Sequence, residues 1–387
     1  MLPNQRLVSL DAFRGFVMIL MASSGFGLAQ MADLNPDSGL WQQIKYQVSH
    51  VPWTGCSLWD LIQPSFMFMV GIAVPLSVRR RKEEGQGFMG LIWHALTRAL
   101  ILILLAVLLS THAKDTKTAW IFTNVLAQIG LGYVFLFVLA RLGWEYCAAA
   151  LVLILCGDWF WFFQHSLPID ESAITAMGAS GKDLLPGFFA HWSKGVNVAA
   201  DFDRWLLNLF PVAQPFVTNA GGYTSMNFVP ALATMLGGAI SGHFLLTSPH
   251  SALQKCGRLL AVAAICLLLG TVIGIVGCPI VKRIWTPSWV LFSGGWVLVL
   301  LAFFYWLVEI AGQRKLVFPL VVVGMNSIFI YVVHSLAAGW IREQLGKHGM
   351  AALFSSYWGP VIERVSVLAV LWFLCLWLYR QRAFLRL

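Results

Sequence analysis

A series of ten apolar segments constrains the fold of this chain more than any other feature of its sequence. Each segment is about 20 residues long, the length that a helix needs to cross the hydrocarbon core of a bilayer. Charged residues make up only 11% of the 387 residues, whereas soluble domains have about 25%. The pattern excludes a soluble or a disordered chain and predicts one all-α membrane domain over residues 1–387. The predicted transmembrane helices are residues 12–30, 58–78, 91–111, 120–140, 146–163, 227–247, 258–277, 289–309, 317–338 and 361–379.

Basic residues next to the spans predict which side of the membrane each loop faces. Lys and Arg accumulate in cytoplasmic loops, and the bias is strongest close to the ends of the spans. The cluster Arg79–Lys82 follows the second span, and the Arg-rich segment Tyr379–Leu387 follows the tenth. We therefore expect both termini to be cytoplasmic and residues 164–226 to form an extracytoplasmic cap. The same bias explains the net charge of +9 without a nucleic-acid partner.

The first apolar segment is predicted to be a retained transmembrane helix and not a signal peptide. Asp11 and Arg14 lie at its start, and nine further spans follow it. With no cleavable targeting segment evident, we expect a multi-pass protein of a bacterial inner membrane. Asp11 and Arg14 are three residues apart and can pair on one helical face. They form either a structural ion pair at the cytoplasmic interface or part of a site for an anionic ligand such as a phosphate.

Polar residues on three predicted spans indicate a cavity inside the bundle, because polar side chains at membrane depth are costly. His50 precedes the second span, and Asp60 and Gln63 share one face of that span. The fourth and ninth spans add polar residues on single faces, namely Asn124, Gln128, Asn326, Ser327, Tyr331 and His334. Hydrogen bonds between helices would explain any one of these residues. The three faces together predict a hydrated pocket with His50 at its outer mouth.

The imidazole of His50 suggests a chemistry for this pocket. At neutral pH an imidazole can act in acyl transfer as a general base or as a nucleophile. Asp60 would orient the ring, and Asn124 or Asn326 would donate hydrogen bonds to the developing oxyanion. The sequence has no Gly-x-Ser-x-Gly elbow, no His-Glu-x-x-His motif and no glycine-rich phosphate loop. Its seven cysteines show no metal-site spacing. These patterns argue against metal-dependent or nucleotide hydrolysis.

Six motifs occur in order along the chain. They are Arg6-Leu7-Val8-Ser9-Leu10-Asp11-Ala12-Phe13-Arg14-Gly15, the run from His50 through Trp53 and Asp60 to Gly71, Asn124 to Ile129, Asp203-Arg204, Pro279 through Lys282 to Thr286, and Pro319 to His334. Together they resemble the signatures of the heparan-alpha-glucosaminide N-acetyltransferase family of membrane acyltransferases. The resemblance implies a homodimeric enzyme that moves acetyl from cytosolic acetyl-CoA to an amino sugar across the membrane. It also implies that His50 is the catalytic histidine.

We therefore predict a transmembrane acyltransferase with acetyl-CoA as donor, no metal, and an amino sugar or another glycan amine or hydroxyl as acceptor. His50 and Asp60 are the predicted catalytic residues, and Asp11 and Arg14 are expected to organise the donor end. The other predicted binding residues are Trp53, Asn124, Gln128, Asn326, Tyr331 and His334. Two alternatives stay open: a transporter or flippase for a small sugar-like substrate, and a catalytically inactive relative with a binding or scaffold role.

Overall fold

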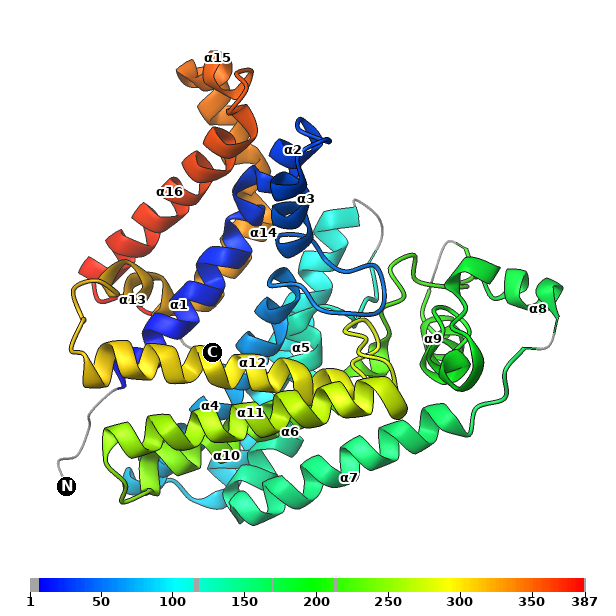
Figure 1. Cartoon of the computed structure of the whole chain (residues 1–387). Coiled ribbons are helices and arrows are strands. Elements are labelled where there is room, and N and C mark those ends of the chain that lie inside the picture. The colour runs from blue at the N-terminus through cyan, green and yellow to red at the C-terminus, as the bar shows by residue number, and fades with distance from the viewer. Residues whose placement is uncertain (1–6, 115–117, 169, 212–213, 386–387) are drawn as a thin grey trace.

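The computed structural model describes residues 7–114, 118–168, 170–211 and 214–385. Figure 1 shows their helices: α1 (Val8–Ala22), α2 (Leu28–Asp33), α3 (Gly39–Gln47), α4 (Ile62–Glu83), α5 (Phe88–Lys114), α6 (Val125–Leu142), α7 (Trp144–Phe163), α8 (Glu171–Ala176), α9 (Val198–Leu207), α10 (Phe228–Thr247), α11 (Ala252–Val276), α12 (Pro287–Tyr305), α13 (Phe318–Gly324), α14 (Ser327–Leu345), α15 (Ala351–Phe354) and α16 (Gly359–Arg380). The only β pairing in the described ranges is an isolated bridge between Thr54 and Val281. The all-α prediction is confirmed.

By length and composition, eight helical segments in the described part of the chain can cross a membrane. They are Trp59–Arg81, Phe88–Ala113, Val125–Leu142, Trp144–Phe163, Ser225–Thr247, Ala252–Val276, Pro287–Ile310 and Gly359–Arg380. Two bent pairs of helices, Val8–Ala22 with Ser24–Asp33 and Phe318–Gly324 with Ser327–Phe354, raise the number to ten if each pair is one span. The chain is a multi-pass membrane protein. The side that each loop faces stays a prediction.

Two of the predicted spans, residues 12–30 and 317–338, are not continuous helices. The first pair bends by 47° and the second by 77°. At the first break residues 24–27 all have positive φ, which residues other than glycine rarely adopt. A Cβ on Gly27 would lie 2.3 Å from the backbone oxygen of Pro360, so only glycine lets this break approach the start of α16. The helix predicted from residue 120 also differs, because it begins at Val125.

The helix α4 connects the two ends of the bundle and contacts α1, α6, α10 and α12. In its middle, a Cβ on Gly71 would lie 1.9 Å from the backbone oxygen of Met235. This close approach packs α4 directly against α10. We call the end of the bundle at which α4 begins the His50 end. The opposite end, at which α4 ends with Arg79–Arg81 and α5 begins, is the Arg-rich end.

The described residues between 164 and 224 form an ordered cap on the end of α7. Figure 1 shows α8 and α9 beside that end. Trp192 of the cap is completely buried in a small apolar cluster with Phe162 at the end of α7 and Val281 in the loop after α11. The cap therefore packs on the loop between α11 and α12, at the His50 end. Its extracytoplasmic location stays a prediction.

Candidate active site

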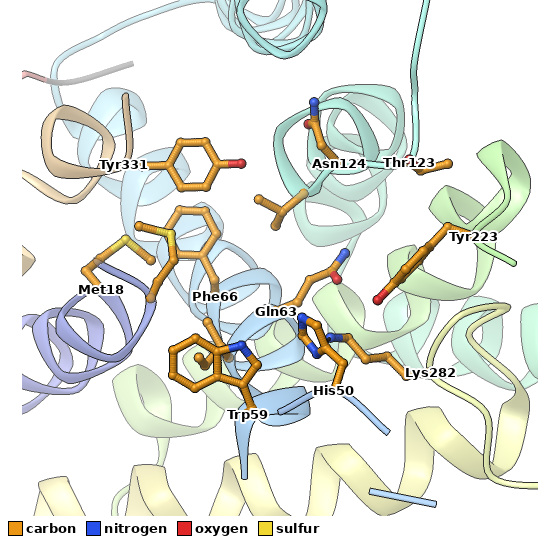
Figure 2. Close-up of a pocket in the computed structure, with 13 residues that line it drawn as sticks. Met18, His50, Trp59, Gln63, Phe66, Thr123, Asn124, Tyr223, Lys282 and Tyr331 are labelled. Atoms are coloured by element: carbon orange, nitrogen blue, oxygen red, sulfur yellow. Dashed lines mark hydrogen bonds between the residues drawn. The ribbon is translucent and has the colours of Figure 1, made fainter. Parts of the chain in front are cut away.

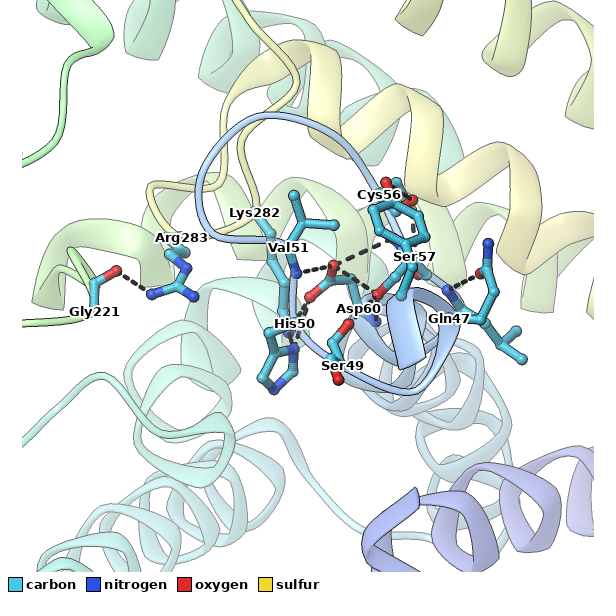
Figure 3. Close-up of polar contacts among 12 residues, drawn as sticks. Gln47, Ser49, His50, Val51, Cys56, Ser57, Asp60, Gly221, Lys282 and Arg283 are labelled. Atoms are coloured by element: carbon cyan, nitrogen blue, oxygen red, sulfur yellow. Dashed lines mark hydrogen bonds and ion pairs between the residues drawn. The ribbon is translucent and has the colours of Figure 1, made fainter. Parts of the chain in front are cut away.

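His50 lies in the loop between α3 and α4, and its ring contacts Asp60 in the turn that precedes α4. The two atoms in contact, Nδ1 of His50 and Oδ1 of Asp60, are 2.7 Å apart. Asp60 is only 1% exposed. Its second oxygen accepts hydrogen bonds from the backbone N–H groups of Val51 and Ser57, both at 3.2 Å, and from Ser57 Oγ at 2.9 Å (Figure 3). The carboxylate is held on both oxygens and in turn fixes the imidazole.

Lys282 joins this pair, although the sequence did not mark it as a site residue. Its Nζ lies 3.2 Å from Asp60 Oδ1 and 3.1 Å from His50 Nδ1. Lys282 is only 5% exposed. Burial lowers the pKa of this ammonium, and the negative charge of Asp60 opposes that shift. Lys282 belongs to one of the six motifs and lies in a short loop between two apolar spans. This position is the signal that could have identified Lys282 as a site residue.

The hydrogen bonds of this group determine which ring nitrogen of His50 carries the proton. A carboxylate only accepts hydrogen bonds, so the short contact with Asp60 places the proton on Nδ1. Lys282 cannot donate to a nitrogen that already carries a proton, and it therefore donates to Asp60. In the neutral ring the other nitrogen, Nε2, therefore carries the lone pair, and it has no hydrogen-bond partner among the described residues. That nitrogen is available as a base or a nucleophile.

Two loops from distant parts of the sequence bring these three side chains together. The backbone N–H of Gly55 donates to the backbone oxygen of Ile280 at 2.9 Å, which joins the His50 loop to the Lys282 loop. Trp53 anchors the His50 loop to the cap, because its Nε1 donates to the backbone oxygen of Trp192 at 3.1 Å. Trp53 was predicted to bind substrate, but it lies outside the cavity lining. Its place in the structure is that of an anchor between loop and cap.

A cavity of about 330 Å³ opens beside His50 (Figure 2). His50 and Lys282 stand at one wall, and the hydroxyl of Tyr223 points toward them from the end of the cap. The remaining lining residues come mainly from α1, α4, α6 and α14, and they are Met18, Met21, Trp59, Ile62, Gln63, Phe66, Thr123, Asn124, Val125 and Tyr331. Burial raises the pKa of Tyr223, so its hydroxyl keeps its proton and can donate a hydrogen bond. The sequence analysis missed Tyr223, because a lone tyrosine in a long loop carries no distinguishing pattern.

Comparison with known proteins agrees with the resemblance carried by the motifs. A family model described as "Heparan-alpha-glucosaminide N-acetyltransferase, catalytic" matches residues 6–180. The resemblance to this family is confirmed. The heparan-alpha-glucosaminide N-acetyltransferase of Homo sapiens is 24% identical over 383 residues, which cover 88% of this chain and 54% of the human protein. The Mus musculus protein of the same name is 23% identical over 379 residues, covering 88% and 55%. The chain spans about half the length of these curated relatives.

Two predicted binding residues on α6 serve structural roles beside the cavity. Asn124 lines the cavity, but it caps α6: its Oδ1 accepts from the backbone N–H of Ala127 at 3.0 Å, and its Nδ2 donates to Ala106 O and Ser110 Oγ, both at 3.1 Å. Gln128 is fully buried and accepts a hydrogen bond from Gln63 at 3.3 Å. Gln63 itself reaches the cavity. The hydrogen bond between Gln63 and Gln128 thus joins the polar face of α4 to that of α6.

The polar residues predicted on one face of the ninth span lie in different places in the structure. Tyr331 alone among them lines the cavity beside His50. Asn326 is fully buried at the break between α13 and α14, where its Oδ1 accepts from the backbone N–H of Leu385 at 3.2 Å. His334 lies 3.4 Å from the hydroxyl of Ser24, measured from Nε2. Asn326 lies at the 77° break between the two helices, whereas Tyr331 and His334 both lie beyond it on α14 and meet different neighbours.

A second cavity, of about 200 Å³, lies toward the Arg-rich end. Arg14 lines it and pairs with Asp11 at 3.5 Å. Arg98 of α5, which the sequence analysis did not select, lines it as well. Phe66 of α4 lines both cavities. The two cavities are therefore neighbours along α4, one beside the catalytic histidine candidate and one beside arginines.

Proposed function

We propose that this chain is a transmembrane acyltransferase that moves an acetyl group from acetyl-CoA to the amine of an amino sugar or glycan. The observation that supports this most strongly is the hydrogen-bonded group of His50, Asp60 and Lys282. In the neutral ring this group leaves the lone pair on Nε2 of His50, beside a cavity large enough for a small acceptor. A general base held in this way is what amine acylation requires. The names of the similar human and mouse proteins agree with this chemistry.

In the direct route, His50 acts as a general base. The acceptor amine attacks the thioester carbonyl carbon, and Nε2 takes the proton that the amine loses as the new C–N bond forms. The C–S bond then breaks, and the departing CoA thiolate takes this proton from the imidazolium. Asp60 stabilises the imidazolium during the reaction through its short contact with Nδ1.

In the covalent route, the same Nε2 attacks the thioester carbonyl carbon and the C–S bond breaks. The departing CoA thiolate takes up a proton from solvent, and Nδ1 of the acetylated ring keeps its proton beside Asp60. The acetyl-imidazole then transfers its acetyl group to the amine, and the amine proton is released to solvent. Both routes use one nitrogen and give the same products. Incubation with radiolabelled acetyl-CoA in the absence of acceptor separates them, because only the covalent route leaves label on the protein.

The oxyanion that develops on the thioester is stabilised by Tyr223 in this proposal. Its hydroxyl points toward His50 across the cavity (Figure 2), and its proton is retained. The two amides that the sequence suggested for this role are less suitable. Asn124 uses both ends of its amide in capping α6, and Asn326 lies outside the cavity beside His50. A hydrogen bond to a developing oxyanion contributes more in such an enclosed site than in water.

The two neighbouring cavities support donor and acceptor entering from opposite ends of the bundle. The acceptor would enter at the His50 end, where the cap lies, and the donor from the Arg-rich end past Phe66. If the Arg-rich end is cytoplasmic, as the basic residues predict, the acetyl group crosses the membrane during transfer. The homodimer implied by the resemblance stays a prediction.

The test uses the full chain reconstituted in lipid nanodiscs with acetyl-CoA and a panel of amino sugars, and it follows free CoA thiol. We expect CoA release that depends on the acceptor, and a fall of about 100- to 10,000-fold in His50→Ala, which loses the base. His112→Ala removes an exposed histidine at the end of α5 and is the matched control, with activity unchanged. Unchanged activity in His50→Ala would contradict the mechanism. Sugar flux without CoA release would favour a transporter.

A further inference from the structure

Two arginines at the Arg-rich end form a connected group with a histidine and a tyrosine. Nη2 of Arg81 lies 2.7 Å from Nε2 of His94. Nη1 of Arg98 donates to the hydroxyl of Tyr133 at 3.0 Å, and its guanidinium lies over the Tyr133 ring, 4.7 Å from the centroid. His94 and Arg98 are four residues apart on α5, and Arg81, His94 and Tyr133 line one small hollow. Arg98 contacts this hollow through Tyr133, and Arg81 also donates from Nη1 to Oε1 of Gln86 at 3.3 Å, so the two guanidiniums are neighbours at the junction of α4, α5 and α6.

Neither guanidinium has a carboxylate partner. The neighbouring Arg79 and Arg80 pair with Glu83 and Glu84, whereas no described carboxylate lies within ion-pair distance of Arg81 or Arg98. Nε of each is buried without a hydrogen-bond partner in the described part of the chain.

The partners that these arginines do have are neutral. Arginine has no acceptor atom, so Nε2 of His94 must accept from Arg81 and carries no proton. Tyr133 likewise presents a neutral hydroxyl and the face of its ring to Arg98. Two positive charges close together without a counter-ion are costly in a partly buried site.

The open space lies beside Arg98, which lines the cavity of about 200 Å³. Arg14 lines the same cavity from α1, and the cavity continues toward His50 at Phe66. An anion in this space would meet the unpartnered face of Arg98. The planar fork of arginine donors matches the oxygens of a phosphate better than any other common anion-binding side chain.

We propose that Arg98 binds a phosphate group in this cavity at the Arg-rich end of the bundle, and that Arg81, which lies outside the cavity lining, adds positive charge nearby. Two molecules could supply it. One is the nucleotide portion of the acyl donor, whose phosphates would be held here while its acyl arm reaches past Phe66; this source rests on the proposed function. The other is the head group of an anionic phospholipid in the leaflet at this end.

The first arm of the test measures the affinity of the full chain for CoA by calorimetry, in nanodiscs made only of phosphatidylcholine. Loss of one charge-assisted contact predicts about 10-fold weaker CoA binding in Arg98→Gln, and loss of a positive charge outside the cavity predicts a smaller decrease in Arg81→Gln. Binding of pantetheine, which has no phosphate, should not change. Arg80→Gln is the matched control, because Arg80 is exposed and paired with Glu84. Arg98→Lys keeps the charge without the fork and should lie between wild type and Arg98→Gln.

The second arm measures thermal stability in nanodiscs with and without phosphatidylglycerol. A lipid source predicts that this anionic lipid raises the Tm of wild type and of Arg80→Gln but not of Arg98→Gln, with CoA affinity equal in all three. The proposal is overturned if neither CoA affinity nor the lipid-dependent Tm distinguishes Arg98→Gln and Arg98→Lys from Arg80→Gln. Both readouts measure binding and need no turnover, so they remain decisive even if the chain transfers no acetyl group.

Discussion

The two ends of the bundle differ in whether their buried positive charges have a negatively charged partner among the described residues. In the catalytic group at the His50 end, the ammonium of Lys282 and the ring of His50 both face the carboxylate of Asp60. At the Arg-rich end, Arg81 and Arg98 face only neutral groups. The first arrangement is complete without a ligand, as a preorganised base should be. The second lacks a negative charge, as a binding site for an anion should.

The largest effect is expected from a substitution of Asp60, which contacts both His50 and Lys282 in the catalytic group. Asp60→Asn removes the carboxylate that fixes the proton on Nδ1 of His50 and leaves Lys282 buried without a counter-charge. Loss of the correct tautomer predicts a fall in kcat of about 1,000-fold or more, and the unpaired charge predicts a loss of about 3–5 kcal/mol in stability. Turnover assays and thermal unfolding in nanodiscs measure the two effects.

The matched control for this variant is Asp33→Asn. Asp33 pairs with Lys45 at an exposed site, where such pairs contribute about 1 kcal/mol at most. We expect it to leave turnover and stability nearly unchanged. Equal effects of the two substitutions would show that the buried carboxylate has no special role.

A smaller effect is expected at Lys282, which acts through Asp60 as a positioning residue. Lys282→Met should lower kcat by about 10-fold, less than loss of the base itself. The acid limb of the pH–rate profile should move to higher pH, because loss of a positive charge 3.1 Å from the ring favours its protonated form. Lys282→Arg should restore the wild-type profile in part, and Lys182→Met, at an exposed position, should not alter it. A purely structural lysine would lower activity without moving the profile.

The smallest effect on turnover, and a clear one on stability, is expected at Asp203 of the cap. This residue is 1% exposed and, among the described residues, has no cationic partner; both of its carboxylate oxygens accept from the backbone N–H of Ser225, at 2.9 and 3.1 Å. Burial raises the pKa of its carboxyl to about 6. The folded cap therefore holds this proton more tightly than the unfolded chain does. The resulting stability is fully present below pH 3.8 and is lost as the pH rises through 6.

Hydrogen exchange of α9 at pH 5 and pH 8 measures this effect. A shift of this size corresponds to about 3 kcal/mol, so we expect the protection factors of the α9 amides, which correct for the intrinsic pH dependence of exchange, to be lower at pH 8 than at pH 5 in the wild type. Asp203→Asn mimics the protonated acid and should remove most of this difference. An unchanged difference between the two pH values in the variant would mean that another group causes it.

The sequence alone determined the membrane character and the all-α class of the chain, and it predicted the pairing of His50 with Asp60 that the structure contains. Spans can be found locally, because the free energy of inserting a helix is close to a sum over its own residues. His50 and Asp60 are only ten residues apart, so a single motif predicts their contact. The breaks at residues 24–27 and after Gly324 were missed, because close packing against other helices sets them and hydropathy does not report it.

Only the tertiary structure brought the remaining site residues into place. Lys282 is 232 positions from His50, and Tyr223 reaches the cavity from the end of the cap. Arg81 on α4 likewise meets His94 on α5. No local pattern predicts such contacts, because they depend on how helices and loops pack together. Because of the same packing, Trp53, Asn326 and His334 lie outside the cavity beside His50, although their residue types alone suggested a binding role.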